Sequence, residues 1–187
     1  MTNSPIVNPS NVGLNTNTNT NTSASKSADS ATSSLPITTI HAIPESLANY
    51  AVIHQQAVQW GEMDAFNHLN NVVYYRYAES ARITYLQTLG MFDGSMITML
   101  AQSSCQYLRP VTYPDTLLLG VRCQRLGNTS IVIEYAYYSC EQQVIVANAE
   151  AVIVRLDSSG SKKLPWTAAE RQRLLALEQD FGHTPQV

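Results

Sequence analysis

The chain has 187 residues, of which 44% are hydrophobic, so it is long enough for one domain with a sizeable core. Its net charge is −3, and its 11 Lys and Arg residues are scattered singly rather than gathered in a basic stripe. This distribution argues against nucleic acid as the main partner, whereas an anionic small molecule would need only a few local positive groups.

The N-terminal segment differs in composition from the rest of the chain. Residues 1–40 contain 23 Ser, Thr and Asn, with an Asn-Thr alternation from Asn15 to Thr22. A segment so poor in apolar side chains cannot offset the entropy cost of ordering its backbone. We therefore expect residues 1–42 to form a disordered tail and residues 43–187 to form the folded domain.

The sequence shows no membrane or export signal. No basic start precedes an apolar run, as in a secretory signal, and no stretch approaches the roughly 20 apolar residues of a membrane helix. We expect a cytoplasmic protein without a membrane partner.

The three cysteines, Cys105, Cys123 and Cys140, form no C-x-x-C pair and each falls within an apparent strand. This usage favours small buried hydrophobes over disulfides, metal ligands or a nucleophile.

A strand, a polar turn and a long helix are the first predicted elements. Apolar and polar residues alternate from Ala51 to Trp60, which predicts a strand, and Gly61 to Asn70 break that pattern. A helix of about five turns should follow, capped by Asn70 or Asn71 and ended by Gly90. Its apolar or small positions recur every three or four residues, at Tyr74, Ala78, Ala81, Tyr85 and Leu89.

Four strands should follow the helix, because the chain changes to a period of two. They are predicted at residues 96–108, 116–126, 130–140 and 143–157, and the turn at residues 127–129 makes the middle two a hairpin. In the last strand both faces are apolar, with Val144, Val146, Val152 and Val154 on one side and Ile145, Ala147, Ala149, Ala151 and Ile153 on the other. We expect the long helix to cover one face and a partner subunit or more of the chain to cover the other.

A short helix should close the chain. Thr167 and Glu170 have the spacing of a capping box, Leu174, Leu177 and Phe181 form an apolar stripe, and Gly182 is a stop signal. The fold class is therefore α+β, with one long helix filling a highly curved antiparallel sheet of about five strands.

The polar turn gathers the chemically interesting side chains. Asp64, His68, Asn70 and Asn71 lie within eight residues, between a strand end and a helix start. A helix N-terminus offers unpaired N–H groups and a partial positive charge, which could polarise a carbonyl, and a nearby carboxylate could attack it or activate water. The alternative is that these residues only close a turn and cap a helix, and that His68 is an ordinary turn histidine.

Other catalytic motifs are missing from the sequence. The four histidines, at positions 41, 54, 68 and 183, have no metal-ligand spacing, so we expect no metal. The chain has neither the G-x-S-x-G elbow of serine hydrolases nor a glycine-rich phosphate loop. No cofactor is expected.

The stretch Val58-x-Trp-Gly-Glu-Met-Asp64-Ala-Phe-Asn-His68-Leu-Asn-Asn71-Val-Val-Tyr74 resembles the signature of hot-dog-fold acyl-CoA thioesterases of the 4-hydroxybenzoyl-CoA thioesterase superfamily. Later segments agree in the same order: Tyr107-Leu-Arg-Pro-Val-Thr-Tyr-Pro-Asp115, Leu126-Gly-Asn-Thr-Ser130 and Ala149 to Asp157. The resemblance covers roughly residues 48–166. It departs from the family at Asn67, where glycine is common.

The resemblance implies roles for individual residues. Asp64 matches the catalytic carboxylate, a nucleophile or general base, and Asn71 matches the position whose backbone N–H polarises the thioester carbonyl. His68 matches a residue that positions substrate or water. The implied substrate-binding residues are Tyr74 and the turn of Asn128, Thr129 and Ser130, which matches a loop along which coenzyme A lies.

The implied partner is an acyl-CoA, more readily aliphatic than aromatic, in a homodimer or homotetramer with active sites at the subunit interface. Two alternatives stay open: a non-catalytic acyl-CoA-binding dimer, and an acyl-thioester hydratase or dehydratase. Pocket depth is predicted to depend on Tyr74, Tyr77, Met96 and Met99. Candidates for contacting the coenzyme A phosphates are Arg109, Arg125, Lys162 and Lys163.

Overall fold

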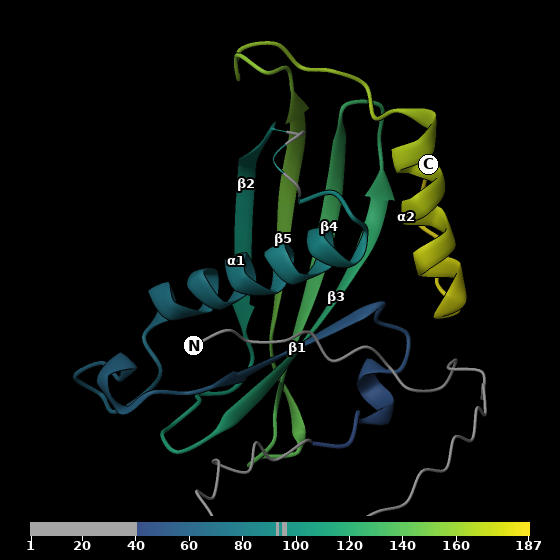
Figure 1. Cartoon of the computed structure of the whole chain (residues 1–187). Helices are drawn as coiled ribbons and strands as arrows, with labels where there is room; N and C mark the ends of the chain where they lie inside the picture. The colour runs from purple at the N-terminus through teal and green to yellow at the C-terminus, as the bar shows by residue number, and fades with distance from the viewer. Residues whose placement is uncertain (1–40, 93, 95–96) are drawn as a thin grey trace, which may run out of the picture.

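A computed structural model describes residues 41–92, 94 and 97–187. It contains one antiparallel sheet with the strand order β1-β3-β4-β5-β2, and helix α1 lies across one face of that sheet (Figure 1). The predicted hot-dog fold is confirmed. The strands are β1 (Val52–Ala57), β2 (Ile97–Tyr107), β3 (Thr116–Leu126), β4 (Ser130–Ser139) and β5 (Val144–Leu156), and the helices are α1 (Asn71–Thr88) and α2 (Ala168–Asp180). Two short 3-10 helices, η2 (Glu45–Leu47) and η3 (Trp60–Glu62), flank β1.

The first strand ends earlier than its sequence pattern predicts. β1 stops at Ala57, which pairs with Thr116, the first residue of β3, and the backbone N–H of Val58 makes one more bond in the same register, to the carbonyl of Asp115 at 3.0 Å. Trp60 then begins η3, whose capping box is formed by Gln59 and Glu62. The alternation that suggested strand up to Trp60 therefore ends in a single helical turn.

Helix α1 packs its predicted face against the sheet. The five apolar or small positions are all buried, and the two alanines at the centre of the face let the backbone approach the strands closely: Tyr74, Ala78, Ala81, Tyr85 and Leu89. Asn70 is the N-cap, because its side chain accepts the N–H of Val72 at 3.1 Å. Gly90 ends the helix with a φ of +62°.

Strand β5 contains a bulge that the alternation of its sequence does not reveal. The register with β4 shifts between Tyr137 and Tyr138, so Val146 has no partner on that strand. Val144 and Val146 consequently pack with Ala147 on the helix side, while Ile145 packs on the outer face. The predicted sides of Val144, Val146 and Ile145 were therefore wrong.

The outer face of the sheet is covered in part by the chain that precedes β1. Leu47 of η2 and Tyr50 form a small second core with Ile53, Leu118 and Ala136. A Cβ atom at Gly120 would stand 2.6 Å from Cγ of Tyr50, so this close approach requires glycine. A partner subunit or more of the chain was predicted to cover this face. Residues that precede β1 in the same chain cover part of it.

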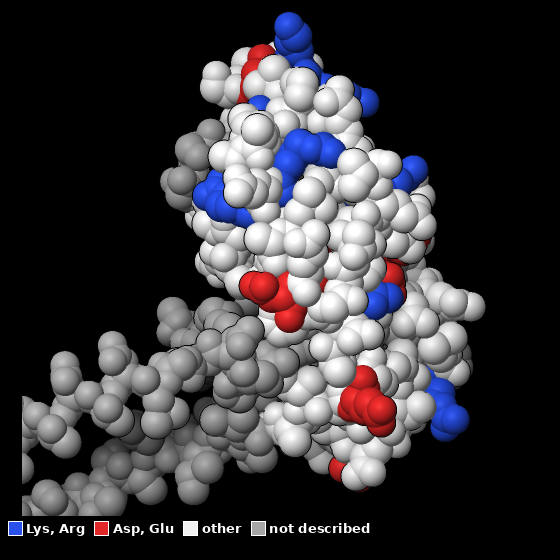
Figure 2. Space-filling view, turned by 90° about the vertical axis from the view of Figure 1, so that its right-hand side faces the viewer, with Lys and Arg blue, Asp and Glu red and all other residues white. Residues whose placement is uncertain are grey.

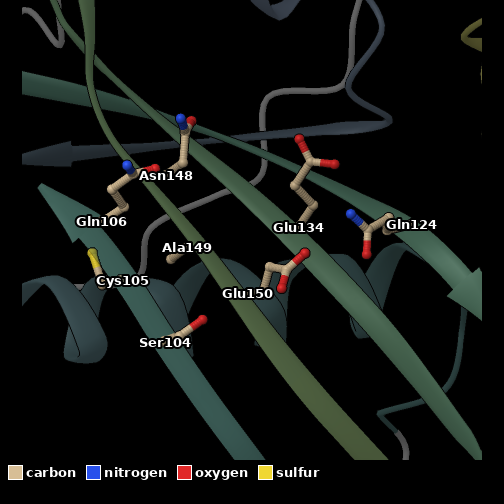
Figure 3. A pocket seen from close by; sticks show the side chains of 8 residues that line it. All are labelled: Ser104, Cys105, Gln106, Gln124, Glu134, Asn148, Ala149 and Glu150. Atoms are coloured by element: carbon tan, nitrogen blue, oxygen red, sulfur yellow. The ribbon is translucent and has the colours of Figure 1, made fainter. Parts of the chain in front are cut away.

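The remainder of the outer face carries polar side chains. Arg122 forms a two-nitrogen ion pair with Glu134, at 3.0 Å in its shortest contact, and lies 4.4 Å from the ring centroid of Tyr50. Glu150 stands directly opposite Glu134 on the neighbouring strand. The side chains of four adjacent strands border a hollow of about 440 Å³ there (Figure 3).

Helix α2 has the predicted cap and stop. The hydroxyl of Thr167 accepts the N–H of Glu170 at 3.2 Å, and the Glu170 carboxylate accepts the N–H of Thr167 at 2.6 Å. Leu174 is fully buried, Leu177 and Phe181 lie against the core, and Gly182 has a φ of +71°. The helix lies beside β3 (Figure 1).

A buried carboxyl group joins α2 to the core. Oε1 of Glu178 accepts the hydroxyl of Tyr85 at 2.5 Å and the backbone N–H of Cys123 at 2.6 Å, whereas Oε2 has no partner among the described residues. Burial raises the pKa of Glu178, although its two donors and the nearby His183 and Arg122 oppose this change. The charged form is therefore costly in the folded state.

Stability should fall with rising pH because of Glu178. Since its folded pKa is raised, its stabilising contribution is complete below the unfolded pKa and is lost as pH rises through the folded pKa. Glu178→Gln keeps the acceptor oxygen and cannot ionise. Urea unfolding at pH 5 and pH 8 should show the variant gaining stability relative to wild type at the higher pH. A difference between the two proteins that does not change with pH would contradict this.

The three cysteines are all free. Cys123 is fully buried, and Cys105 and Cys140 are partly buried, so all three act mainly as small apolar side chains, as predicted. Cys140 lies one residue beyond the end of β4 rather than within it. Burial raises the pKa of the Cys105 and Cys140 thiols to about 11.

The distribution of surface charge and the lengths of the helices can be compared with the expectations from the sequence. On the face shown in Figure 2, charged side chains are separated by broad uncharged areas. Among the described residues, no helix is both long and apolar enough to span a bilayer. The predicted tail lies outside the described residues except for His41 and Ala42, and Met96 lies outside them as well.

Candidate active site

The loop between β1 and α1 is held by its own backbone. Met63 and Leu69 form an isolated antiparallel bridge, the N–H of Asp64 bonds to the carbonyl of His68 at 2.7 Å, and the N–H of Asn67 bonds to the carbonyl of Asp64 at 3.0 Å. Asn67 adopts a φ of +61°, a conformation that asparagine tolerates better than most residues with a Cβ atom. Asparagine thus serves at a position where the resemblance implies glycine.

Asp64 closes this turn with only one of its two carboxylate oxygens. Oδ1 accepts the N–H of Phe66 at 2.8 Å and the N–H of His68 at 3.1 Å. Oδ2 accepts no hydrogen bond from the described residues. Closing the turn and acting on a substrate are therefore compatible, because the first role fixes the carboxylate and leaves the second oxygen available.

The helix N-terminus beside Asp64 keeps an available donor. The cap Asn70 uses its side chain for the N–H of Val72, and its carbonyl accepts the N–H of Val73 at 2.9 Å. The N–H of Asn71, the first helical residue, donates no hydrogen bond within the described part of the chain. Such a group carries part of the positive end of the helix dipole and suits a developing negative charge.

One hollow of about 330 Å³ is lined by both Asp64 and Asn71. It brings together four of the predicted site residues, Asp64, His68, Asn71 and Tyr74. It is completed by Leu69 and by residues 107–110, which are the last residue of β2 and the three that follow it. Sequence reasoning did not assign Tyr107, Leu108 and Pro110 to the site. The sequence pointed to these residues only through the resemblance of Tyr107 to Asp115 to the thioesterase family. That resemblance gives their order in the chain but not their position in space.

The aromatic rings of Tyr74 and Tyr107 line the hollow, and Tyr137 packs against Tyr74. The rings of Tyr74 and Tyr107 meet edge to face at 5.0 Å, and Tyr137 lies 5.4 Å from Tyr74. The hydroxyl of Tyr137 donates to the carbonyl of Tyr74 at 2.7 Å, and that of Tyr107 donates to the carbonyl of Asn71 at 3.3 Å. Burial raises the pKa of Tyr74 to about 12, so its hydroxyl stays neutral at physiological pH.

The other predicted contacts lie away from this hollow. Asn128, Thr129 and Ser130 form the turn between β3 and β4, whereas Tyr107 pairs with Ala147 near the opposite end of the sheet. Tyr77 is buried beneath the loop and Met99 is exposed on β2, and neither lines the hollow. Of the candidates for phosphate contacts, Arg109 alone lines it.

The larger hollow on the outer face is a weaker candidate for the site. Amide and carboxylate side chains, including Gln106, Glu134 and Asn148, border it (Figure 3). Its described lining residues all lie in strands and none at a helix start, and two carboxylates would repel an anionic intermediate. Among the described residues, no group of three or more His, Cys, Asp and Glu is placed to hold a metal ion.

Comparison with known proteins identifies the family. The model of the thioesterase-like superfamily matches residues 58–174, a range that includes the loop, both helix starts and all strands after β1. The chain belongs to this superfamily. It is accordingly a thioester hydrolase, in agreement with the resemblance found in its sequence.

Several known proteins match the chain over most of their own length. YsmA of Bacillus subtilis is 30% identical over 129 residues, which cover 68% of this chain and 87% of that protein. A Thermus thermophilus thioesterase, solved with coenzyme A and zinc, is 30% identical over 70% of this chain and 97% of that one, with a TM-score of 0.63. A thioesterase-superfamily structure from Jannaschia is 25% identical, with 70% and 84% covered and a TM-score of 0.65.

Proposed function

We propose that this thioester hydrolase acts on acyl-CoA, converting it with water to a carboxylic acid and coenzyme A. The observation that supports this most is one hollow lined by both Asp64 and Asn71, whose Oδ2 and backbone N–H form no hydrogen bond with other described residues. The Thermus thermophilus relative was solved with coenzyme A, which supports coenzyme A as the thiol carrier. Arg109, which lines the hollow, is the candidate for a phosphate contact.

The chemistry follows from the two groups. The N–H of Asn71 would donate to the thioester oxygen as negative charge develops there. Asp64 would act in one of two ways: its carboxylate attacks the carbonyl carbon and expels the thiolate, leaving an anhydride that water opens, or it takes a proton from water that attacks directly. His68 would orient the water or the substrate. Both routes add water across the C–S bond.

The acyl group would lie against apolar and aromatic side chains. Leu69, Leu108, Pro110 and the ring of Tyr74 form that part of the hollow, which suits an aliphatic chain. Asn128, Thr129 and Ser130 would meet the coenzyme A tail only far from the thioester or from a second copy of the chain. We propose residues 43–187 as the unit that folds and catalyses.

A panel of substrates tests the proposed function. Thiol release is measured for acyl-CoAs of increasing chain length, and absorbance at an enoyl-CoA is followed in parallel. The proposal predicts thiol release that equals acid formation for at least one chain length. Tight binding of every acyl-CoA without turnover would instead favour a binding protein, and enoyl-CoA consumption without thiol release would favour a hydratase.

We also propose that two chains pair through β2. This strand is an edge of the sheet, and it exposes apolar side chains, with Leu100 at 46% and Met99 at 52% exposed. A long apolar edge left open would be an aggregation hazard in a monomer. Tyr107, at the end of β2, lines the hollow, so pairing there would enclose the site.

A charge on this edge should break the pairing. Leu100→Lys would place an ammonium group in an apolar contact, and we expect sedimentation velocity to show monomers where wild type shows dimers. Activity should fall with the dimer fraction. Gln87→Lys, at an exposed position of α1, is the control that adds the same charge elsewhere. A Leu100→Lys protein that sediments as wild type would contradict pairing through β2.

A further inference from the structure

Glu62 ties the catalytic loop to helix α1 through both its side chain and its backbone. Its carboxylate accepts hydrogen bonds from the guanidinium of Arg76 and the hydroxyl of Tyr77, and also from the N–H of Gln59 at 2.9 Å. Its backbone carbonyl accepts the N–H of Asn70, the helix cap, at 2.9 Å. One residue therefore contacts the loop, the cap and the second turn of the helix.

The contact with Tyr77 is the well-shielded part of this network. The Glu62 side chain is 13% exposed and Tyr77 is buried, whereas the Arg76 side chain is 60% exposed. An ion pair with so exposed a partner contributes little. Burial, followed by the nearby carboxylate, raises the pKa of Tyr77 well above its usual value, so the hydroxyl stays a neutral donor. A charge-assisted hydrogen bond of this kind is among the strong ones.

Glu62 does not line the hollow, yet it is linked to both reacting groups, to one along the chain and to the other through a hydrogen bond. Asp64 follows it by two residues, and Asn71 follows the cap that its carbonyl holds. The distance from the carboxylate of Asp64 to the N–H of Asn71 therefore depends on how the loop docks on the helix. Displacements of about 1 Å in such an arrangement cost on the order of 100-fold in rate.

We propose that Glu62 is a positioning residue, which acts with Tyr77 to hold Asp64 at the right place relative to the N-terminus of α1. This inference rests on the proposed function for its kinetic consequences, but its structural content does not depend on the substrate. The sequence suggested that Tyr77 helps to set pocket depth. The proposal instead gives Tyr77 the role of holding the loop from outside the hollow.

Kinetics of Glu62→Gln, Tyr77→Phe and the double variant test the proposal. We expect each single change to lower kcat on the order of 10-fold, with KM within about twofold of wild type. The double variant should be no slower than the slower single variant, because both changes remove the same contact. Tyr50→Phe is the matched control, since it removes a Tyr–Glu hydrogen bond, to Glu134 at 2.9 Å, on the outer face. Wild-type kcat in Tyr77→Phe, or a fall no larger than in Tyr50→Phe, would overturn the proposal.

Hydrogen–deuterium exchange provides a readout that needs no turnover. In Tyr77→Phe, amides of the loop at residues 63–70 should exchange faster, while those of β3 and β4 keep their wild-type rates. Unchanged loop exchange would overturn the positioning role even if kcat had fallen. If wild type hydrolyses no acyl-CoA, the proposed function fails, and the exchange result still decides whether Glu62 and Tyr77 hold the loop.

Discussion

Replacing Asp64 with asparagine should lower thiol release from acyl-CoA on the order of 100-fold or more, because the variant has neither a nucleophile nor a base at this position. The side-chain oxygen of asparagine can still accept the N–H groups of Phe66 and His68, so the turn should keep its shape. Acyl-CoA binding should therefore stay close to that of wild type. Initial rates under saturating substrate and calorimetric binding measure the two effects separately.

Asp157→Asn is the matched control for this change. Asp157 also closes a turn with Oδ1, which accepts the N–H of Ser161 at 3.0 Å and that of Lys162 at 3.2 Å, but it lies away from the hollow. We expect its substitution to leave the rate near that of wild type. Equal rates for wild type and Asp64→Asn would exclude Asp64 from the chemistry, and equal losses in the two variants would reduce its role to closing the turn.

Gly120→Val should destabilise the fold by about 3 kcal/mol, the upper part of the range for overpacked sites. A Cβ atom at Gly120 would lie 2.6 Å from Cγ of Tyr50 and 2.9 Å from Cδ2 of Leu47. Both neighbours belong to the segment that covers the outer face, so this segment would have to move and expose Ile53 and Leu118. Thermal unfolding should shift downward by roughly 10 °C for a chain of this size.

Gly61→Val provides the comparison for stability, because a Cβ atom at Gly61 would meet nothing within 4 Å. Its melting temperature should stay within a few degrees of wild type. If Gly120→Val melts at the wild-type temperature, Leu47 and Tyr50 do not pack tightly on the outer face. If it melts much lower, the segment before β1 belongs to the folded unit.

Local patterns in the sequence were sufficient for most of the fold. The face of α1 from Tyr74 to Leu89 followed from a period of 3.6, and the bounds of β3 from alternation that ends at the turn beginning with Gly127. The cap at Thr167 followed from the side-chain chemistry of the capping box. In each case the residues that determine the element are close neighbours in the chain.

Features that depend on distant residues could not be obtained in this way. The bulge at Val146 exists because β4 and β5 change register there, and Val146 itself is an ordinary strand residue. β1 ends at Ala57 because its partner strand β3 begins at Thr116, which is far away in the chain. Both depend on the partner strand, which an alternation of apolar residues does not identify.

In the candidate site too, the parts formed by neighbouring residues could be predicted and the parts formed by distant residues could not. The turn around Asp64 and the start of α1 are local, and their chemistry was recognisable in the sequence. Tyr107 and Arg109 reach the hollow because β2 crosses the sheet beside β5 and ends next to the loop. The turn from Asn128 to Ser130 was chosen by resemblance, and the strand order places it near the other end of β4. Its contact with coenzyme A stays a prediction.

A crystal structure of Asp64→Asn with an intact acyl-CoA bound would test the central claim most directly, namely that Asp64 and the N-terminus of α1 form a thioester-hydrolysing centre. The substrate should survive in this variant. We predict that the thioester oxygen lies about 3 Å from the backbone nitrogen of Asn71, with the side chain of residue 64 facing the carbonyl carbon. A thioester bound elsewhere, in the outer-face hollow for example, or with its oxygen directed away from Asn71, would contradict this claim.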